Sequence, residues 1–319
     1  MEGREMPETF CNNSTKGAFR LGTRGSALAR WQANWTADQL RTLGFTVEIV
    51  VIQTSGDVVQ KDAIVNIGEQ GVFTKEIQHA LLENKIDIAV HSLKDLPTEY
   101  VTGLSLVAVP KRESYRDVFV SHIAENIENL PLGSRIGTGS MRRKTQVLYH
   151  FGDRYRVEDI RGNVETRLRK LEQREYDALI LAEAGLNRLG LANVIRSFLE
   201  PPFFLPAIGQ GALGWEVRSD DQRTADLLKL LNDEQTFAMV RAERAMLREM
   251  RGGCSAPIAA LAQIDDSGSV LSLHGRILSL DGKQMFETTQ SAPFADDPEL
   301  LGINVARTLI HEQSRMSLS

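Results

Sequence analysis

The feature of this sequence that most constrains its fold is the alternation of short apolar runs with helical periods. Expected strands at residues 19–22, 46–52 and 86–90 are separated by expected helices at 26–43 and 73–84. The runs are short and mainly apolar rather than alternating, which is typical of strands in a mostly parallel sheet covered by helices on both faces. We therefore predict an α/β fold for the first part of the chain.

The same alternation continues through a second block. Two further expected strands, residues 104–109 and 117–120, carry the chain into this block. It continues with expected strands at 134–136, 156–160 and 178–181 and expected helices at 142–151 and 164–174. After a proline-containing stretch, residues 212–217 read as a strand that returns to the first block. Two sheets joined by crossing strands predict a hinged pair of lobes with a cleft between them.

The C-terminal third has a different order, in which helices come first and strands follow. The expected elements are helices at 221–231 and 234–250, strands at 258–264, 270–278 and 284–289, and a helix at 298–313. This pattern predicts a small α+β domain. The expected organisation is a disordered arm (1–17), domain 1 (18–112 and 212–230), domain 2 (113–211) and domain 3 (231–319).

Composition excludes several classes of partner. The 319 residues include 42 acidic and 37 basic side chains, for a net charge of −5. Nucleic acids and anionic membranes select basic surfaces, so we expect neither as a partner, and no apolar stretch has the length of a membrane span. The two cysteines, Cys11 and Cys254, make a disulfide framework improbable and suit a reducing, cytoplasmic compartment. The six histidines show no metal-ligand spacing, so no metal is expected.

Basic residues recur just after the expected strands, or along the helix that follows. They are Arg24, Lys94, Arg142, Arg143, Arg161, Arg167 and Arg188. In open α/β sheets the ligand crevice lies outside the carboxyl ends of the strands, and helix N-termini such as those at Ser26 and Ser140 also favour anions there. The set predicts a cleft for a ligand with several carboxylates. For any single member, a structural ion pair or a solvated helix start explains the residue equally well.

Two further residues are candidates for chemistry. Asp95 lies at the same sheet edge among these cations, where it either acts on a ligand or caps the following turn. Cys254 follows two glycines on an expected loop. A lone cysteine of this kind fits a nucleophile or attachment point, and it also fits a small buried hydrophobe.

Six motifs together resemble the hydroxymethylbilane synthase family, also called porphobilinogen deaminase. They are RLGTRGSALA (20–29), DIAVHSLKDLP (87–97), GTGSMRR (137–143), RGNVETR (161–167), PAIGQGA (206–212) and GGCSAP (252–257). The resemblance runs from about residue 18 to the C-terminus and keeps the order and spacing of the family. It implies two lobes like those of type II periplasmic binding proteins, followed by a small third domain.

The resemblance also implies a reaction and its residues. Cys254 would hold a dipyrromethane cofactor by a thioether, and four porphobilinogen units would be joined head to tail with loss of ammonia before hydrolysis frees hydroxymethylbilane. Asp95 would be the catalytic carboxylate of a monomeric enzyme. Cofactor binding is implied for Lys94, Asp95, Ser140, Arg142, Arg143, Arg161, Arg167 and Arg188, and substrate binding for Arg24, Ser26, Arg161 and Arg167.

Three positions depart from the family pattern. Gln70 stands where a lysine is usual, Asn66 occupies a position that is basic in some relatives, and Gly139 replaces a common serine. We interpret these as altered loop chemistry rather than a different reaction. Two rival functions stay open on residues alone: a non-enzymatic binding module, and an acyltransferase or hydrolase that uses Cys254 with a distant histidine.

Overall fold

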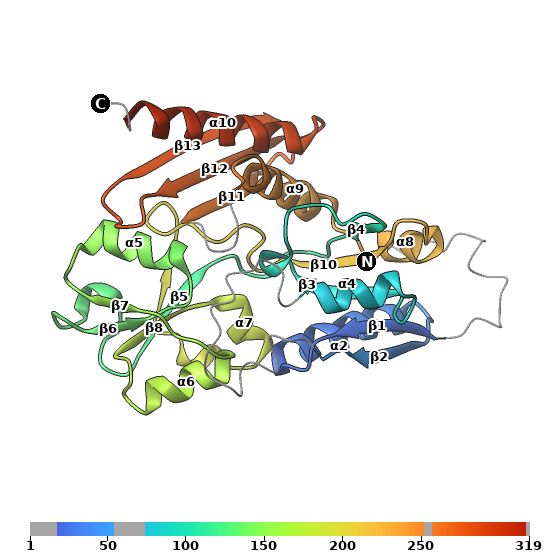
Figure 1. Cartoon of the computed structure of the whole chain (residues 1–319), viewed down its shortest axis with the longest axis horizontal. Coiled ribbons are helices and arrows are strands. Elements are labelled where there is room, and N and C mark those ends of the chain that lie inside the picture. Colours follow the sequence, from blue (N-terminus) through green and yellow to red (C-terminus); the bar gives the residue numbers. More distant parts are fainter. Residues whose placement is uncertain (1–17, 54–73, 252–256, 317–319) are drawn as a thin grey trace.

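The computed structural model describes residues 18–53, 74–251 and 257–316, and these form two α/β lobes side by side with a third layer above them (Figure 1). The first lobe holds the sheet β2-β1-β3-β10-β4. Its strands are β1 (Phe19–Thr23), β2 (Val47–Val51), β3 (Ile88–Ser92), β4 (Leu104–Ala108) and β10 (Leu213–Arg218), and its helices are α2 (Ala27–Thr42), α4 (Lys75–Leu82) and α8 (Gln222–Lys229).

The second lobe repeats this arrangement with the sheet β7-β6-β8-β5-β9. Its strands are β5 (Asp117–Ser121), β6 (Arg135–Gly137), β7 (Arg156–Glu158), β8 (Ala178–Ala182) and β9 (Ser197–Leu199), and its helices are α5 (Met141–Phe151), α6 (Val164–Glu172) and α7 (Glu183–Arg188). Short 3-10 turns η2 (Leu93–Asp95), η3 (Ile127–Asn129) and η4 (Ala192–Val194) complete the two lobes.

In each sheet one strand runs against its neighbours. β10 pairs antiparallel with both β3 and β4, and β5 pairs antiparallel with both β8 and β9. In each sheet the other four strands lie in the order second, first, third, fourth along the chain, and the antiparallel strand is inserted between the third and the fourth. This is the arrangement of type II periplasmic-binding-protein lobes. The expected return of the chain to the first sheet through residues 212–217 is confirmed, as is the predicted fold class.

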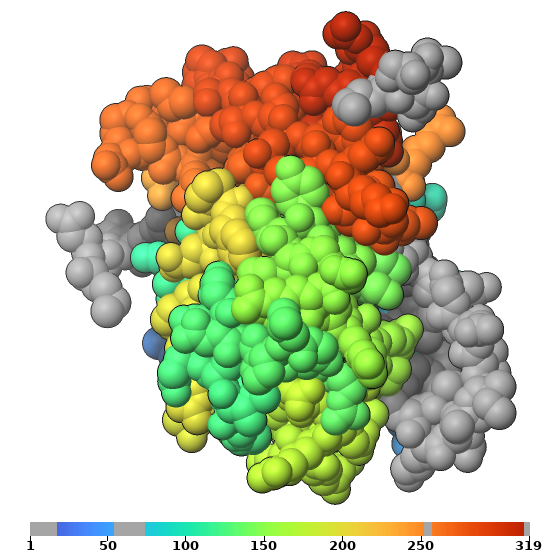
Figure 2. Space-filling model, turned by 90° about the vertical axis from the view of Figure 1, so that its left-hand side faces the viewer, coloured from blue at the N-terminus to red at the C-terminus, as the bar shows by residue number. Residues whose placement is uncertain are grey.

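The third layer is an antiparallel sheet of β11 (Ile258–Ile264), β12 (Val270–Leu278) and β13 (Met285–Pro293). Helices α9 (Glu234–Glu249) and α10 (Pro298–Met316) pack on it through a core that includes Met246, Leu273 and Val305. Figure 2 shows this C-terminal part seated directly on the second lobe. The α+β prediction for this part is confirmed.

Most expected elements lie within two residues of the observed ones, and the differences have local causes. The strand expected at 86–90 begins at Ile88, because the Ile86 carbonyl accepts from the Arg218 side chain rather than from the ladder. The strand expected at 156–160 ends at Glu158, and the helix expected at 73–84 covers Lys75–Leu82. Strand β9 was not predicted.

Candidate active site

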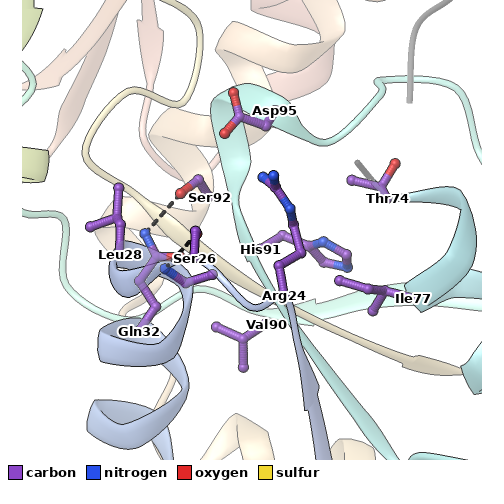
Figure 3. A pocket seen from close by; sticks show the side chains of 11 residues that line it. Arg24, Ser26, Leu28, Gln32, Thr74, Ile77, Val90, His91, Ser92 and Asp95 are labelled. Atoms are coloured by element: carbon purple, nitrogen blue, oxygen red, sulfur yellow. Dashed lines mark hydrogen bonds between the residues drawn. The ribbon is translucent and has the colours of Figure 1, made fainter. Parts of the chain in front are cut away.

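A pocket opens at the carboxyl ends of β1 and β3 (Figure 3). The residues that line it include Arg24, Ser26, Gln32, His91, Ser92 and Asp95. The Arg24 side chain extends from the end of β1 toward the turn that carries Asp95. The sequence-based expectation that strand ends in the first lobe bring these residues to one edge therefore agrees with the structure.

Local capping fixes the first side of this pocket. The Ser26 Oγ accepts from the Ala29 N–H at 3.3 Å, so Ser26 is the N-cap of α2 and Arg24 lies in the connection just before it. Gln32, six residues after Ser26 on α2, donates to the Ser92 hydroxyl at 2.8 Å and ties the helix to the end of β3. Arg24 and Ser26 are both half-buried.

Buried neighbours fix the other side. Asp95 ends the short turn η2 and is exposed, whereas Leu93 and Leu96 on either side of it are buried in a core that also contains Val240 of α9. The Leu93 N–H donates to the carbonyl of Ala212 at 3.0 Å. The Asp95 carboxylate thus emerges from a turn whose flanks are held in the protein interior.

Cations from both lobes lie close enough to Lys94 and Asp95 to act on them electrostatically. Desolvation lowers the pKa of Lys94 to about 8, with Arg143 and Arg142 of α5 adding to the effect and Asp95 and Asp117 opposing it. Desolvation and Arg143 also lower the pKa of Arg167, while Asp95 opposes the change. Among these groups four cations face two carboxylates. The expected convergence of basic residues from two lobes is seen here.

Arg142 and Arg143 are buried, and both contact Asp117 at the start of β5. Arg142 Nη1 lies 2.6 Å from Asp117 Oδ2, and Arg143 Nη2 lies 2.7 Å from Asp117 Oδ1. Burial alone would raise the pKa of Asp117, but the two guanidinium groups lower it to about 2. The Arg142 Nε–H is buried without a hydrogen-bond partner among the described residues. Part of each arginine is therefore used in an ion pair, and a donor of Arg142 is left over.

The remaining second-lobe candidates lie around the N-termini of α5 and α6. Ser140 is the N-cap residue of α5, but its side chain makes no capping bond. Arg167 is half-buried and donates through Nε to the Gly162 carbonyl at 2.8 Å. Arg161 is exposed and pairs with Asp159 at 2.8 Å. Arg161 and Asp159 both act on Arg167, so the three side chains share one region.

Arg188 lies where the two lobes meet. It is buried, donates to the Gly211 carbonyl at 2.7 Å, and lies 5.9 Å from the ring centroid of Trp31 on α2. Desolvation lowers its pKa to about 10, against the effect of Glu113. This contact joins α7 of the second lobe to α2 of the first.

The carboxylates that pair with buried residues near the pocket were not predicted from the sequence. His91 is buried and lies 3.2 Å from Glu216 on β10, which also accepts from Gln78 of α4 at 3.1 Å. Asp117 was also missed as the partner of two arginines. A charged residue inside an otherwise apolar strand was the available signal in both cases, since such a residue must find a partner when buried.

Several expectations fall outside the described residues. They concern Cys11 and Cys254, with the predicted thiol attachment, and Gln70 and Asn66, with the altered loop chemistry. Within the described ranges no three His, Cys, Asp or Glu side chains gather as a metal site requires. No helix in the described part of the chain is long and apolar enough to cross a membrane.

Comparison with known families decides the relationship. Residues 19–226 match the model described as porphobilinogen deaminase, dipyromethane cofactor binding domain, and residues 237–311 match the porphobilinogen deaminase C-terminal domain. The chain belongs to the porphobilinogen deaminase family. Together the two models cover both lobes and nearly all of the third layer.

Individual members of the porphobilinogen deaminase family align along almost the whole chain. The porphobilinogen deaminase of Trichlorobacter lovleyi is 48% identical over 92% of this chain and 93% of its own length. That of Geobacter sulfurreducens is 47% identical over 92% and 91%. Among solved structures, the methionine-binding protein MetQ gives a TM-score of 0.45 at 11% identity, over 69% of this chain and 92% of that chain.

Dipyrromethane is the cofactor of the porphobilinogen deaminase family, and the described residues fit it. Its two pyrrole rings carry carboxylates, which require cations, and ring N–H groups, which require an acceptor. Lys94 of the first lobe and Arg167 of the second both interact electrostatically with Asp95, which is exposed, and Arg142 and Arg143 act on Lys94. The buried Nε–H of Arg142 is a donor suited to a ligand carboxylate.

Proposed function

We propose that Asp95 is the catalytic carboxylate of this porphobilinogen deaminase and that Cys254 holds dipyrromethane by a thioether. The enzyme is a transferase: it joins four porphobilinogen molecules head to tail with loss of ammonia from each, and hydrolysis releases hydroxymethylbilane. The observation that carries the assignment is that Asp95 lines one pocket with Arg24 and interacts electrostatically with Lys94 of its own lobe and Arg167 of the other.

The cations divide by position. We assign Arg24 and Ser26, which line the pocket of the first lobe, to the acid groups of the incoming substrate, together with Arg161 and Arg167 at the α6 end. The cofactor carboxylates are assigned to Lys94, Ser140, Arg142, Arg143, Arg161, Arg167 and Arg188. Asp117 supports this division, because it fixes the orientation of Arg142 and Arg143 while using only part of their donors.

The chemistry of the chain follows from these charges. Asp95 accepts hydrogen bonds from pyrrole N–H groups and stabilises the positive charge that develops on a substrate ring as ammonia departs. The cations at the site bind the acetate and propionate groups, which aligns the two reacting rings. When bound, dipyrromethane supplies the ring carbon to which the first substrate is joined.

Purified protein incubated with porphobilinogen tests the assignment. Product is measured as uroporphyrin after acid-catalysed ring closure and oxidation. Asp95→Asn keeps the shape of the side chain and removes its charge, so we expect kcat to fall by about 100- to 1,000-fold. Asp226→Asn, an exposed aspartate on α8, is the matched control and is expected to keep wild-type activity. An Asp95→Asn enzyme with most of the activity would refute the role of Asp95.

The organisation of the enzyme is also proposed. Domain 1 comprises residues 18–112 and 212–230, domain 2 comprises 113–211, and domain 3 begins at 231. The return of β10 to the first sheet supports the split in domain 1. We infer a cytoplasmic location, since two cysteines suit a reducing compartment. We also propose that the enzyme is a monomer. Sedimentation at micromolar concentration should give the mass of one chain, and a dimer would contradict the monomer.

A further inference from the structure

Helix α9 lies directly against the turn that carries Asp95. Figure 1 shows α9 between the three-stranded sheet and the first lobe. Its residue Val240 is fully buried with Leu93 and Leu96, the two leucines that flank Lys94 and Asp95. Residues four apart on a helix share a face, so Arg244 follows Val240 on the side of α9 that meets this turn.

Arg244 binds the backbone just after Asp95. Its Nη1 donates to the Leu96 carbonyl at 2.9 Å, and its Nη2 donates to the Pro97 carbonyl at 2.7 Å. A guanidinium group presents its donors in a rigid plane, so two bonds to successive carbonyls fix both the position and the direction of the chain. A lysine has no such fork.

The turn needs this support on its C-terminal side. On the N-terminal side, the Leu93 N–H donates to Ala212 at 3.0 Å. Within the turn, the Leu96 N–H donates to Leu93 at 3.3 Å, while Asp95 itself is exposed. Arg244 supplies two shorter bonds at the point where the chain leaves the turn.

We propose that Arg244 is a positioning residue for the reaction, which holds the Asp95 turn in register with helix α9. The inference rests on the proposed function of Asp95. In the sequence, α9 ends at Glu249 and Cys254 follows five residues later, so the helix that supports the carboxylate also leads to the proposed attachment residue. Arg244 thus joins helix α9 to the turn that carries Asp95.

The role predicts a specific kinetic signature. The residues proposed to bind the substrate carboxylates do not include Arg244. Replacing Arg244 should therefore change KM by less than about threefold. A carboxylate displaced by about 1 Å costs about 100-fold in rate, so kcat should fall by about 10- to 100-fold when both bonds are lost. A purely structural defect would instead lower the amount of folded enzyme and leave the kcat of the folded fraction unchanged.

The experiment compares Arg244→Met, which keeps the aliphatic stem, with Arg244→Lys, which keeps the charge and reaches one carbonyl at a time. Arg241→Met is the matched control, since Arg241 lies on the same helix and pairs with Asp297 and Glu299 within the C-terminal part. Each full-length variant is assayed with porphobilinogen. Intact-mass measurement gives the cofactor-loaded fraction used to normalise kcat.

The inference predicts that kcat is highest for wild type and Arg241→Met, lower for Arg244→Lys and lowest for Arg244→Met. KM should be similar in all four proteins. Equal kcat for wild type and both Arg244 variants would overturn it, as would a change confined to KM. If the Met variant does not fold, the same comparison is made with the Lys variant alone. A wild-type protein without activity would refute the proposed function instead, so the two failures are distinguishable.

Discussion

The Glu243 carboxylate lies 2.6 Å from Nη1 of Arg112 with its side chain completely buried. It also accepts from the Gly209 N–H at 2.7 Å and the Ala262 N–H at 3.0 Å. Arg112 and Gly209 belong to the two segments that cross between the lobes, and Ala262 belongs to β11. One carboxylate on α9 therefore joins both crossovers to the C-terminal sheet.

Glu243→Gln should destabilise the protein strongly. The substitution leaves Arg112 buried without a charge partner, and breaking a buried ion pair in this way costs about 3–5 kcal/mol. The free energy of unfolding from guanidinium titration measures the effect. Glu249 lies on the same helix as Glu243 and forms a more exposed pair with Arg307 of α10, so Glu249→Gln should cost about 1 kcal/mol or less. Equal losses in the two variants would show that the junction at Glu243 contributes little.

Stability at acid pH should depend on Asp117. Its pKa is lowered from 3.8 to about 2 in the folded protein, chiefly because Arg142 and Arg143 outweigh the effect of burial. A carboxyl with a lowered folded-state pKa adds stability above its unfolded pKa, and this is lost as pH falls from about 3.8 toward 2. Wild type should therefore lose stability relative to Asp117→Asn over that window. Parallel stability curves for the two proteins would contradict the ion-pair cluster.

Activity should fall on the alkaline side because Lys94, which is assigned to the cofactor carboxylates, loses its proton. The pKa of this ammonium is about 8, so the cation is present below that pH and is lost as pH rises through it. We expect kcat/KM to fall above about pH 8, since this parameter reports groups of the free enzyme. Lys94→Arg keeps the charge and should move the fall to higher pH. An unchanged pH dependence of kcat/KM in that variant would show that the alkaline fall does not come from Lys94.

Gly139 should not accept the serine that is common at this position in the family. A Cβ at Gly139 would lie 2.9 Å from the carbonyl oxygen of Ile160, a backbone atom that cannot turn aside. Gly139→Ser should therefore destabilise the protein by about 1–3 kcal/mol through overpacking. Gly185→Ala on α7 is the control, as its Cβ would meet only Leu28 at 3.8 Å. A Gly139→Ser variant with the same free energy of unfolding as wild type would show that the backbone before α5 and α6 adjusts to the added side chain.

Much of the fold was predictable because helices and buried strands leave periodic signals. The apolar runs that became β3 and β8 and the helix that became α2 were located to within two residues. Strand β9 left no such signal, since its three residues pair at the edge of the sheet with β5, far away in the sequence. A strand that forms only because it pairs with a distant segment cannot be located from its own few residues.

The candidate site was predictable in place but not in detail. Arg24 and Asp95 were assigned to one strand edge, and they line one pocket. Sequence could not show that Arg142 and Arg143 contact Asp117, because 25 residues separate the first pair and any of several carboxylates could fill that role. Arg244 was missed for the same reason, since its partners lie about 150 positions earlier in the chain.

The mass of the purified protein tests the central claim most directly. If cations of both lobes hold a dipyrromethane attached to Cys254, the intact wild-type chain carries the mass of two pyrrole rings beyond its sequence, and a Cys254→Ser chain carries none. Reconstituting each protein with porphobilinogen before the measurement excludes an unloaded form. Wild-type and Cys254→Ser proteins that both match their sequence masses would contradict the account.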